Sequence, residues 1–126
     1  MIKIKSIILP NEPLSNFQLM DAVKDLKIKN FRGVFLRDQL PKKPKKKECG
    51  IINLADSDDS QGTHWVAYYK DSDNDLKVYF DSYGIQPPLE LIAYLKDPIY
   101  YSREQVQPNN TVVCGHLCLR FLSKLK

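Results

Sequence analysis

The chain has 126 residues, enough for one domain with a hydrophobic core and too few for two of ordinary size. Hydrophobic residues make up 43% and charged residues 27%, which excludes disordered, collagen-like and membrane-embedded classes. The net charge of +4 is uneven: residues 1–47 hold twelve Lys and Arg against four Asp and Glu, and residues 48–126 hold seven against eleven. We expect a single domain over residues 1–126, with no membrane partner and a basic first part suited to polyanions.

The first half of the chain predicts strands around one helix. Isoleucines and lysines are interleaved over residues 1–10, which predicts a strand and differs from the continuous apolar core of a signal peptide, so we expect an intracellular protein. Ser15 is a candidate N-cap for a helix over about residues 16–28. Residues 49–54 predict a short buried strand before the acidic, polar stretch 56–62.

A run of lysines and prolines ends the basic part of the chain, and its charged members are Lys42, Lys43, Lys45, Lys46 and Lys47. Such a run is typical of a contact with DNA or another polyanion, or of a nuclear import signal. The alternative is a solvated loop, because the lysines repel one another and the two prolines oppose a helix. Nucleic-acid binding by these lysines is therefore one of two predictions for the run.

The three cysteines, Cys49, Cys114 and Cys118, do not form the pairs of a disulfide framework. Cys114 and Cys118 are four positions apart, a spacing that makes their side chains parallel on a helix rather than convergent. We expect reduced thiols, as in a cytosolic or nuclear protein.

Two runs rich in β-branched and aromatic residues, 63–70 and 76–83, predict a β-hairpin. The acidic turn between them, residues 71–75, resembles the start of a calcium loop but lacks the glycine and the bidentate glutamate that such a loop requires, so we expect a polar turn and no metal site. If the hairpin is symmetric about this turn, His64 lies directly opposite Asp81, within reach of an imidazole–carboxylate hydrogen bond.

The last third of the chain predicts two helices and a strand. After the Pro-Pro pair, residues 89–96 predict a short helix and residues 100–107 a further strand. Residues 111–126 have apolar positions at helical spacing, which predicts a buried amphipathic helix with Cys114 in its first turn. We expect an α+β fold in which an antiparallel sheet packs against the central helix that carries Cys114.

His64, Asp81 and Cys114 are the residue types of a thiol hydrolase. The first turn of a helix favours a thiolate, His64 would take the thiol proton, and Asp81 would orient the imidazole. The alternatives are a histidine satisfied by a carboxylate at a sheet edge and a buried core cysteine, and the second is what we expect of Cys118. His116 lies about 200° around the helix from Cys114, which leaves His64 as the candidate base.

Gln107 and Gly115 complete the candidate site. Gln107 precedes the Cys114 helix in a loop, and its amide could join the backbone N–H of Cys114 as the two donors to a tetrahedral oxyanion. Gly115 would let a substrate or another backbone approach closely. A loop glutamine carries little information by itself.

Four segments together resemble the adenovirus-type (adenain-like) cysteine proteases, a group that also contains the SUMO and ubiquitin-like-protein proteases. They are residues 62–65 (Gly-Thr-His-Trp), 80–84 (Phe-Asp-Ser-Tyr-Gly), 106–107 (Val-Gln) and 114–115 (Cys-Gly). The seven-residue spacing from Gln107 to Cys114 is similar to that of the adenoviral branch. Weaker similarity in residues 20–26 and 49–53 extends the resemblance over most of the chain.

The resemblance implies a thiol endopeptidase with Cys114 as nucleophile, His64 as base, Asp81 as its partner and Gln107 in the oxyanion hole. It implies cleavage after glycine in viral or virus-like precursor proteins, with Trp65 shaping the channel that admits so small a residue. It also implies a monomer without a required cofactor, located in the host nucleus or cytoplasm or packaged in the virion. Stimulation by DNA through the lysine run is a further expectation. Activation by a captured peptide is not, because no cysteine lies between Asp81 and Gln107.

Two other functions stay open. One is a protease that removes ubiquitin or a ubiquitin-like protein, which a probe ending in Gly-Gly would trap covalently. The other is an inactive protease-like fold that binds nucleic acid through residues 42–47, for which we expect an unreactive Cys114 and salt-sensitive DNA binding.

Overall fold

Five strands form one mixed sheet in a computed structural model of the chain, which describes residues 1–55, 64–109 and 111–125. In sheet order the strands are β3 (Phe31–Leu36), β4 (Lys47–Asn53), β5 (Trp65–Asp71), β6 (Leu76–Phe80) and β7 (Tyr100–Tyr101). The inner pairs, β4–β5 and β5–β6, are antiparallel, whereas both edge pairs, β3–β4 and β6–β7, are parallel.

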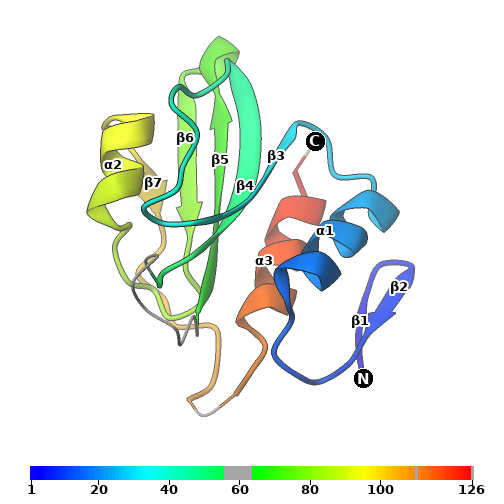
Figure 1. Cartoon of the computed structure of the whole chain (residues 1–126). Helices are drawn as coiled ribbons and strands as arrows, with labels where there is room; N and C mark the ends of the chain where they lie inside the picture. Colours follow the sequence, from blue (N-terminus) through cyan, green and yellow to red (C-terminus); the bar gives the residue numbers. More distant parts are fainter. Residues whose placement is uncertain (56–63, 110, 126) are drawn as a thin grey trace.

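Helices cover both faces of this sheet (Figure 1). Helix α2 (Leu89–Leu95) lies on one face, and α1 (Asn16–Asp25) and α3 (Cys114–Ser123) lie on the other. A separate hairpin of β1 (Ile2–Ile4) and β2 (Ile7–Leu9) packs against α3. The structure confirms a mixed α+β architecture.

Successive residues of the inner strands enter two different cores, because strand side chains alternate between the two faces of a sheet. On β4, Ile51 belongs to the core shared with α1 and α3, and Ile52 to the core shared with α2. On β5, Ala67 belongs to the core shared with α1 and α3, and Val66 to the core shared with α2. Full burial of each large apolar side chain contributes about 1.5–3 kcal/mol. The middle strand, β5, is therefore held from both sides and gives a rigid base to the residues at its ends.

The predicted antiparallel sheet is wrong at both edges. Parallel neighbours require a crossover connection instead of a tight turn. Residues 37–46 cross over from β3 to β4, and a segment that contains α2 crosses from β6 to β7. Neither connection has a periodic signal that reveals the direction of pairing, so the sequence pattern alone did not distinguish the two arrangements.

Three other predicted elements have different limits in the structure. Residues 1–10 form the hairpin β1–β2 instead of one strand, with Lys5 at a φ of 49° in the turn. Helix α1 has the expected N-cap, Ser15, but ends at Asp25 because Lys27 adopts a left-handed φ of 56°. In the predicted strand 100–107 only the first two residues pair in the sheet. The acidic stretch 56–62 lies outside the described residues.

One buried carboxylate, Glu48, fastens the loop that carries the lysine run to the sheet. Its oxygens accept hydrogen bonds from the Tyr68 hydroxyl at 2.5 Å, the Tyr94 hydroxyl at 2.9 Å and the Lys45 backbone N–H at 2.5 Å. Arg32 Nη1 adds an ion pair at 3.2 Å. Since removing any one donor would leave a desolvated charge less well satisfied, this cluster holds the loop, β5 and α2 together at one end of the sheet.

Candidate active site

His64 and Asp81 meet at the other end of the sheet, through a register that differs from the predicted one. Tyr68 pairs with Tyr79. In the predicted register, in which His64 faces Asp81, its partner would be Lys77, so the observed partner lies two residues further along the chain. The turn is centred one residue later than predicted, because Asp71 still belongs to β5 and pairs with Leu76. The connection is therefore residues 72–75, which contain the 3₁₀ turn η1 (Ser72–Asn74).

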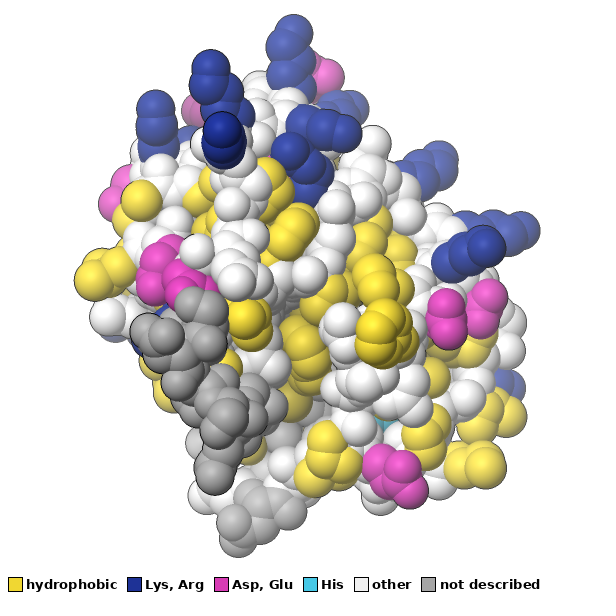
Figure 2. Space-filling model, viewed as in Figure 1, with side chains coloured by type: hydrophobic (Ala, Val, Ile, Leu, Met, Phe, Trp, Pro, Cys, Tyr) yellow, Lys and Arg dark blue, Asp and Glu magenta, His cyan; other side chains and the backbone are white. Residues whose placement is uncertain are grey.

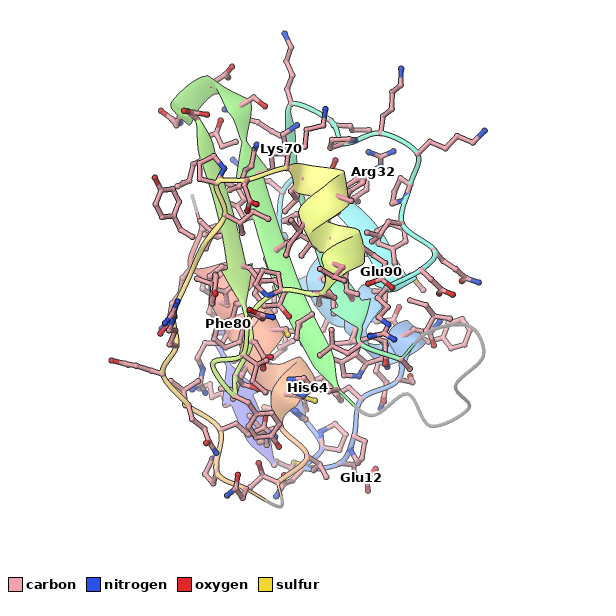
Figure 3. All side chains as sticks on the ribbon, turned by 90° about the vertical axis from the view of Figure 1, so that its left-hand side faces the viewer. Glu12, Arg32, His64, Lys70, Phe80 and Glu90 are labelled. Atoms are coloured by element: carbon pink, nitrogen blue, oxygen red, sulfur yellow. The ribbon has the colours of Figure 1, made fainter. Side chains whose placement is uncertain are left out.

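A shift of two residues keeps both side chains on the same face, since the side-chain period of a strand is two. His64 and Asp81 are therefore diagonal neighbours instead of directly opposed ones, and Nε2 of His64 lies 2.7 Å from Oδ1 of Asp81. Figure 3 shows His64 where β5 begins, beside the first turn of α3. The predicted hydrogen bond is confirmed, although the predicted pairing is wrong.

Tyr83 orders both members of this pair. Its backbone N–H donates to Oδ1 of Asp81 at 2.8 Å. Its ring stacks on the imidazole of His64, with centroids 4.8 Å apart and planes inclined by 26°. The imidazole is thus held at its edge by a carboxylate and on its face by an aromatic ring.

Cys114 is the first residue of α3 and approaches the same end of β5, because α3 packs against that strand. The first-turn position predicted from the sequence is confirmed. The Trp65 backbone N–H donates to Sγ of Cys114 at 3.4 Å, and the Gly115 N–H also interacts with the sulfur. The side chain is only 7% exposed. Backbone donors in the first turn of a helix stabilise a thiolate, so this position suits a nucleophile.

The two groups shift each other's pKa in opposite directions. Burial raises the pKa of the Cys114 thiol, but hydrogen bonds from His64 and the Trp65 N–H, with the charge of His64, outweigh burial and lower it below its ordinary value. Burial lowers the pKa of His64, but hydrogen bonds to Asp81 and Cys114 and the charges of both outweigh burial and raise it to about 9. Because Asp81 occupies Nε2, Nδ1 is the ring nitrogen left for the thiol. Both shifts favour the charged forms, a thiolate beside an imidazolium.

Gln107 lies in the loop before α3 and is 1% exposed. Its Oε1 accepts a hydrogen bond from the Ser82 hydroxyl at 2.6 Å. Its Nε2 donates to the carbonyl and hydroxyl oxygens of Thr111 at 3.1 and 2.9 Å. The loop brings Gln107 to the wall of the pocket that also holds Cys114.

A pocket of about 340 Å³ opens over these residues. It is lined by Pro13, Leu14, His64, Trp65, Tyr83, Gln107, Thr111, Val112 and Cys114. The Trp65 indole N–H donates to the Leu14 carbonyl at 2.9 Å, which fixes the ring between this pocket and a neighbouring groove that both residues also line. Three of the four predicted catalytic residues line one cavity, and Asp81 is bonded to His64 behind it.

Gly115 lies where α3 packs closely against other segments of the chain. A Cβ at this position would lie 3.2 Å from Cδ1 of Trp65, 3.3 Å from Cδ2 of Leu19 and 3.4 Å from Cδ1 of Leu14. Gly115 is buried and is not among the residues that line the pocket. The glycine lets α3 pack closely against Trp65 and α1.

The lysine run lies at the opposite end of the molecule from Cys114. Figure 2 shows many Lys and Arg side chains at the top of the view, with others along its right side, and Figure 3 shows Lys70 and His64 at opposite ends of β5. A groove of about 520 Å³ at the basic end is lined by several residues, among them Lys42, Lys43, Lys70, Lys77 and Lys96. The structure does not bring the predicted nucleic-acid-binding lysines to the candidate active site.

The second histidine and the other two cysteines lie away from the pocket. Nε2 of His116 donates to the Pro10 carbonyl at 2.8 Å, and burial lowers the pKa of His116. Burial raises the pKa of Cys118 well above its ordinary value, and burial followed by the charge of Glu48 raises the pKa of Cys49 to about 12. All three thiols are free, as predicted, and Cys114 alone among them has a lowered pKa.

The described residues supply no assembled metal ligands. Across residues 1–55, 64–109 and 111–125, no cluster of three or more His, Cys, Asp or Glu side chains could hold an ion. In the acidic turn the Asp71 carboxylate instead accepts hydrogen bonds from the Asn74 amide at 2.7 Å and the Asp73 N–H at 3.1 Å, as in a polar turn. Nor does this part of the chain contain a helix with the length and apolarity to cross a membrane.

Six pocket residues or supports have no individual role in the sequence interpretation: Pro13, Leu14, Ser82, Tyr83, Thr111 and Val112. Tyr83 had a usable signal, because the correct turn centre would have placed it opposite His64. Leu14 and Thr111 had none, since their contacts join segments whose approach depends on tertiary packing.

Comparison of the chain with protein-family models gives no match. Comparison with curated proteins gives none either. The assignment of this site therefore depends on the geometry of its own residues.

Proposed function

We propose that this protein is a cysteine endopeptidase in which Cys114 is the nucleophile, His64 its base and Asp81 the group that orients His64. The observation that carries the proposal is the convergence of these three side chains, from α3, the start of β5 and the turn after β6, at one pocket. A histidine bonded to a carboxylate, or a buried cysteine, is common in protein cores. A thiol of lowered pKa beside such a histidine, at an open pocket, is much less common and is typical of a catalytic site.

In the proposed mechanism the Cys114 thiolate attacks the carbonyl carbon of the scissile peptide. A C–S bond forms and the carbonyl oxygen takes up the negative charge; as the C–N bond breaks, the His64 imidazolium gives its proton to the departing amine. A water molecule then loses a proton to His64 and attacks the thioester, which releases the acid product and restores the thiolate. Asp81 on Nε2 keeps the other ring nitrogen of His64 directed at the sulfur through both halves of the cycle.

Two donors are proposed for the oxyanion: the backbone N–H of Cys114 and the side-chain amide of Gln107. Nε2 of Gln107 donates to two oxygens of Thr111, its carbonyl and its neutral hydroxyl. A charged oxyanion is a stronger acceptor than that hydroxyl, so the amide would exchange one contact for the other as the intermediate forms. Loss of one such donor typically costs about a hundred- to a thousandfold in rate.

We propose substrates with glycine at the cleavage site, in viral or virus-like precursor proteins, and a fold related to that of the adenovirus-type proteases. The small residue is supported by the Trp65 ring, which lines the pocket beside Cys114 and is held in place by its hydrogen bond to Leu14. A fixed indole next to the nucleophile favours a residue without a side chain.

Cleavage of a fluorogenic peptide with Gly-Gly before the scissile bond tests this proposal. We expect activity in the wild-type protein and a loss of at least about a thousandfold in Cys114→Ala. Cys49→Ala, which removes a buried thiol outside the pocket, is the matched control and should retain activity. Equal activity in wild type and Cys114→Ala would exclude the assignment.

A separate observation, the lysines that line the basic groove, supports a second candidate function, polyanion binding. The groove is lined by lysines from the 42–47 loop, from β5, from β6 and from the end of α2. Such a surface suits a DNA backbone, either as a stimulating cofactor of the protease or as the ligand of an inactive fold.

Salt-dependent DNA binding tests the basic groove. For each phosphate that a lysine neutralises, the slope of log affinity against log salt steepens by about 0.9. We expect the double variant Lys42→Ala, Lys43→Ala to bind more weakly with a shallower slope, whereas Lys24→Ala, an exposed lysine on α1, should bind as wild type. Equal slopes in all three proteins would exclude the groove.

A further inference from the structure

Ser82, the residue after Asp81, holds Gln107 from inside the protein. It is fully buried, and its hydroxyl donates to Oε1 of Gln107 at 2.6 Å. Its backbone carbonyl accepts from the N–H groups of Val106 and Gln107 at 2.8 and 3.0 Å. One residue therefore binds both the side chain and the backbone of Gln107, and joins it to the turn that carries Asp81.

The surrounding acceptors decide which end of the Gln107 amide faces Ser82. The Thr111 carbonyl can only accept, so Nε2 must lie on the Thr111 side. The Thr111 hydroxyl gives its own proton to the Pro108 carbonyl at 2.8 Å, and so it too accepts from Nε2. Oε1 is left facing Ser82, where the hydroxyl is the group that donates to it.

We propose that Ser82 is a positioning residue for the oxyanion donor, which keeps Nε2 of Gln107 on the pocket side. An amide rotated by half a turn would present its oxygen to the oxyanion and repel it. Without the Ser82 hydroxyl, Oε1 would be a buried acceptor lacking its donor, and the amide would gain by leaving this orientation. This inference rests on the proposed protease function, because it concerns how one of its donors is held.

Two reagents separate the oxyanion hole from the nucleophile. Acetyl-glycyl-glycinal captures the thiol as a hemithioacetal, in which the C–S bond forms and the aldehyde oxygen becomes an oxyanion or, after protonation, a hydroxyl. Iodoacetamide alkylates the thiolate by displacing iodide and forms no tetrahedral oxyanion. A defect in Gln107 positioning should therefore weaken capture of the aldehyde and leave alkylation of Cys114 unchanged.

We expect Ser82→Ala to weaken inhibition by acetyl-glycyl-glycinal about tenfold. Gln107→Ala should weaken it at least as much, and the double variant should be no weaker than Gln107→Ala, because Ser82 acts through Gln107. Ser123→Ala is the matched control: it removes another buried serine hydroxyl, which donates to the Arg120 carbonyl at 2.9 Å outside the pocket. Ser82→Cys, which keeps a weak donor, should fall between wild type and Ser82→Ala.

Either of two results would overturn the role of Ser82: aldehyde inhibition in Ser82→Ala equal to wild type, or additive losses in the double variant. If Ser82→Ala does not fold, as judged by urea unfolding, inhibition of Ser82→Cys equal to that of Ser123→Ala overturns it instead. Failure of the wild-type protein itself to capture the aldehyde or to cleave peptides, while Cys114 is still alkylated, would contradict the protease function and remove the basis of the inference.

Discussion

Contacts that oppose burial determine the protonation of Cys114 and His64. Both side chains lie in surroundings that disfavour their charged forms, yet hydrogen bonds and the opposite charge of the partner move each pKa toward the charged form. Asp81 supports the charged state because it accepts a hydrogen bond at Nε2.

A bell-shaped pH profile of kcat/KM is expected from these shifts. Activity rises as pH passes the lowered pKa of Cys114, because the thiolate then forms, and falls near pH 9, where His64 loses its proton. Initial rates of peptide cleavage across pH 5 to 10 measure both limbs. An alkaline limb close to the ordinary histidine value of 6.5 would contradict the raised pKa of His64.

Replacement of Asp81 by asparagine should lower kcat/KM by at least about a hundredfold, since a neutral amide neither stabilises the imidazolium nor fixes the tautomer of His64. The alkaline limb of the profile should also move below pH 9, because hydrogen bonding to Asp81 and its charge help to raise the pKa of His64. Asp73→Asn, an exposed carboxylate in the β5–β6 turn, is the matched control. An unchanged profile in Asp81→Asn would show that Asp81 has no such role.

At the scale of elements, local periodicity predicts the parts of the fold in which one face of an element is buried. The hairpin of β5 and β6 and the helix α3 follow from alternating and helical patterns, and the Ser15 cap from a local motif. The parallel edges of the sheet do not follow, because their partners are brought together by crossovers whose path depends on packing.

Much of the candidate site could also be anticipated, but not how it is supported. The register predicted from a symmetric turn differs from the observed one by two residues, and an even difference keeps His64 and Asp81 on the same face. A register difference of one residue would place the two side chains on opposite faces of the sheet. No periodic pattern in the sequence predicts the hydrogen bonds of Gln107 to Ser82 and Thr111. The predicted oxyanion role of Gln107 depends mainly on the family resemblance.

The turn after β6 depends on a glycine. Gly84 has a φ of 72°, and a Cβ there would lie 2.5 Å from the Arg103 carbonyl oxygen. We expect Gly84→Ala to reduce the free energy of unfolding by about 1–3 kcal/mol, through the left-handed backbone and this clash. Because the displaced segment leads to Gln107, activity should fall as well.

Urea unfolding and peptide cleavage test the Gly84 prediction together. Gln86→Ala changes an exposed residue of the same loop and should match wild type in both measurements. A Gly84→Ala protein as stable and as active as Gln86→Ala would show that residues 103–107 do not depend on this close approach.

At the scale of the whole molecule, the candidate active site and the basic groove lie at opposite ends of the sheet. The candidate active site lies where β5 begins, and the basic groove lies where β5 ends, fastened by the Glu48 cluster (Figures 1 and 3). A polyanion at the groove would not compete with a peptide for space at Cys114. Any effect of DNA on cleavage would have to act through the sheet or by bringing substrate and protein together.

The stability of the molecule should also depend on His116, which links the N-terminal segment to α3 through Pro10. Its folded-state pKa lies below the ordinary value of 6.5, so as pH falls below 6.5 the unfolded chain takes up a proton that the folded one resists. This favours unfolding, and above pH 6.5 the effect is absent. His64, whose pKa is raised to about 9, acts oppositely: its contribution is complete below 6.5 and is lost as pH rises toward 9.

Urea unfolding at pH 5 to 6.5 measures the acid-side effect of His116. We expect His116→Gln to lose less stability than wild type across this range, although its stability at pH 7 is lower. His64→Gln should lose stability below pH 6.5 as the wild-type protein does, because it retains His116. The same pH dependence in wild type and His116→Gln would contradict a neutral, buried His116.

Alkylation of Cys114 by iodoacetamide as a function of pH reports the thiolate–imidazolium pair itself. Mass spectrometry of digested protein separates this thiol from Cys49 and Cys118, whose raised pKa values should make them slow. The proposed pair predicts that Cys114 in wild type titrates below the ordinary cysteine value of 9.0, and that His64→Ala raises its apparent pKa, because burial then acts with less opposition. Titration at or above 9.0 in wild type, or the same titration in both proteins, would contradict the pair.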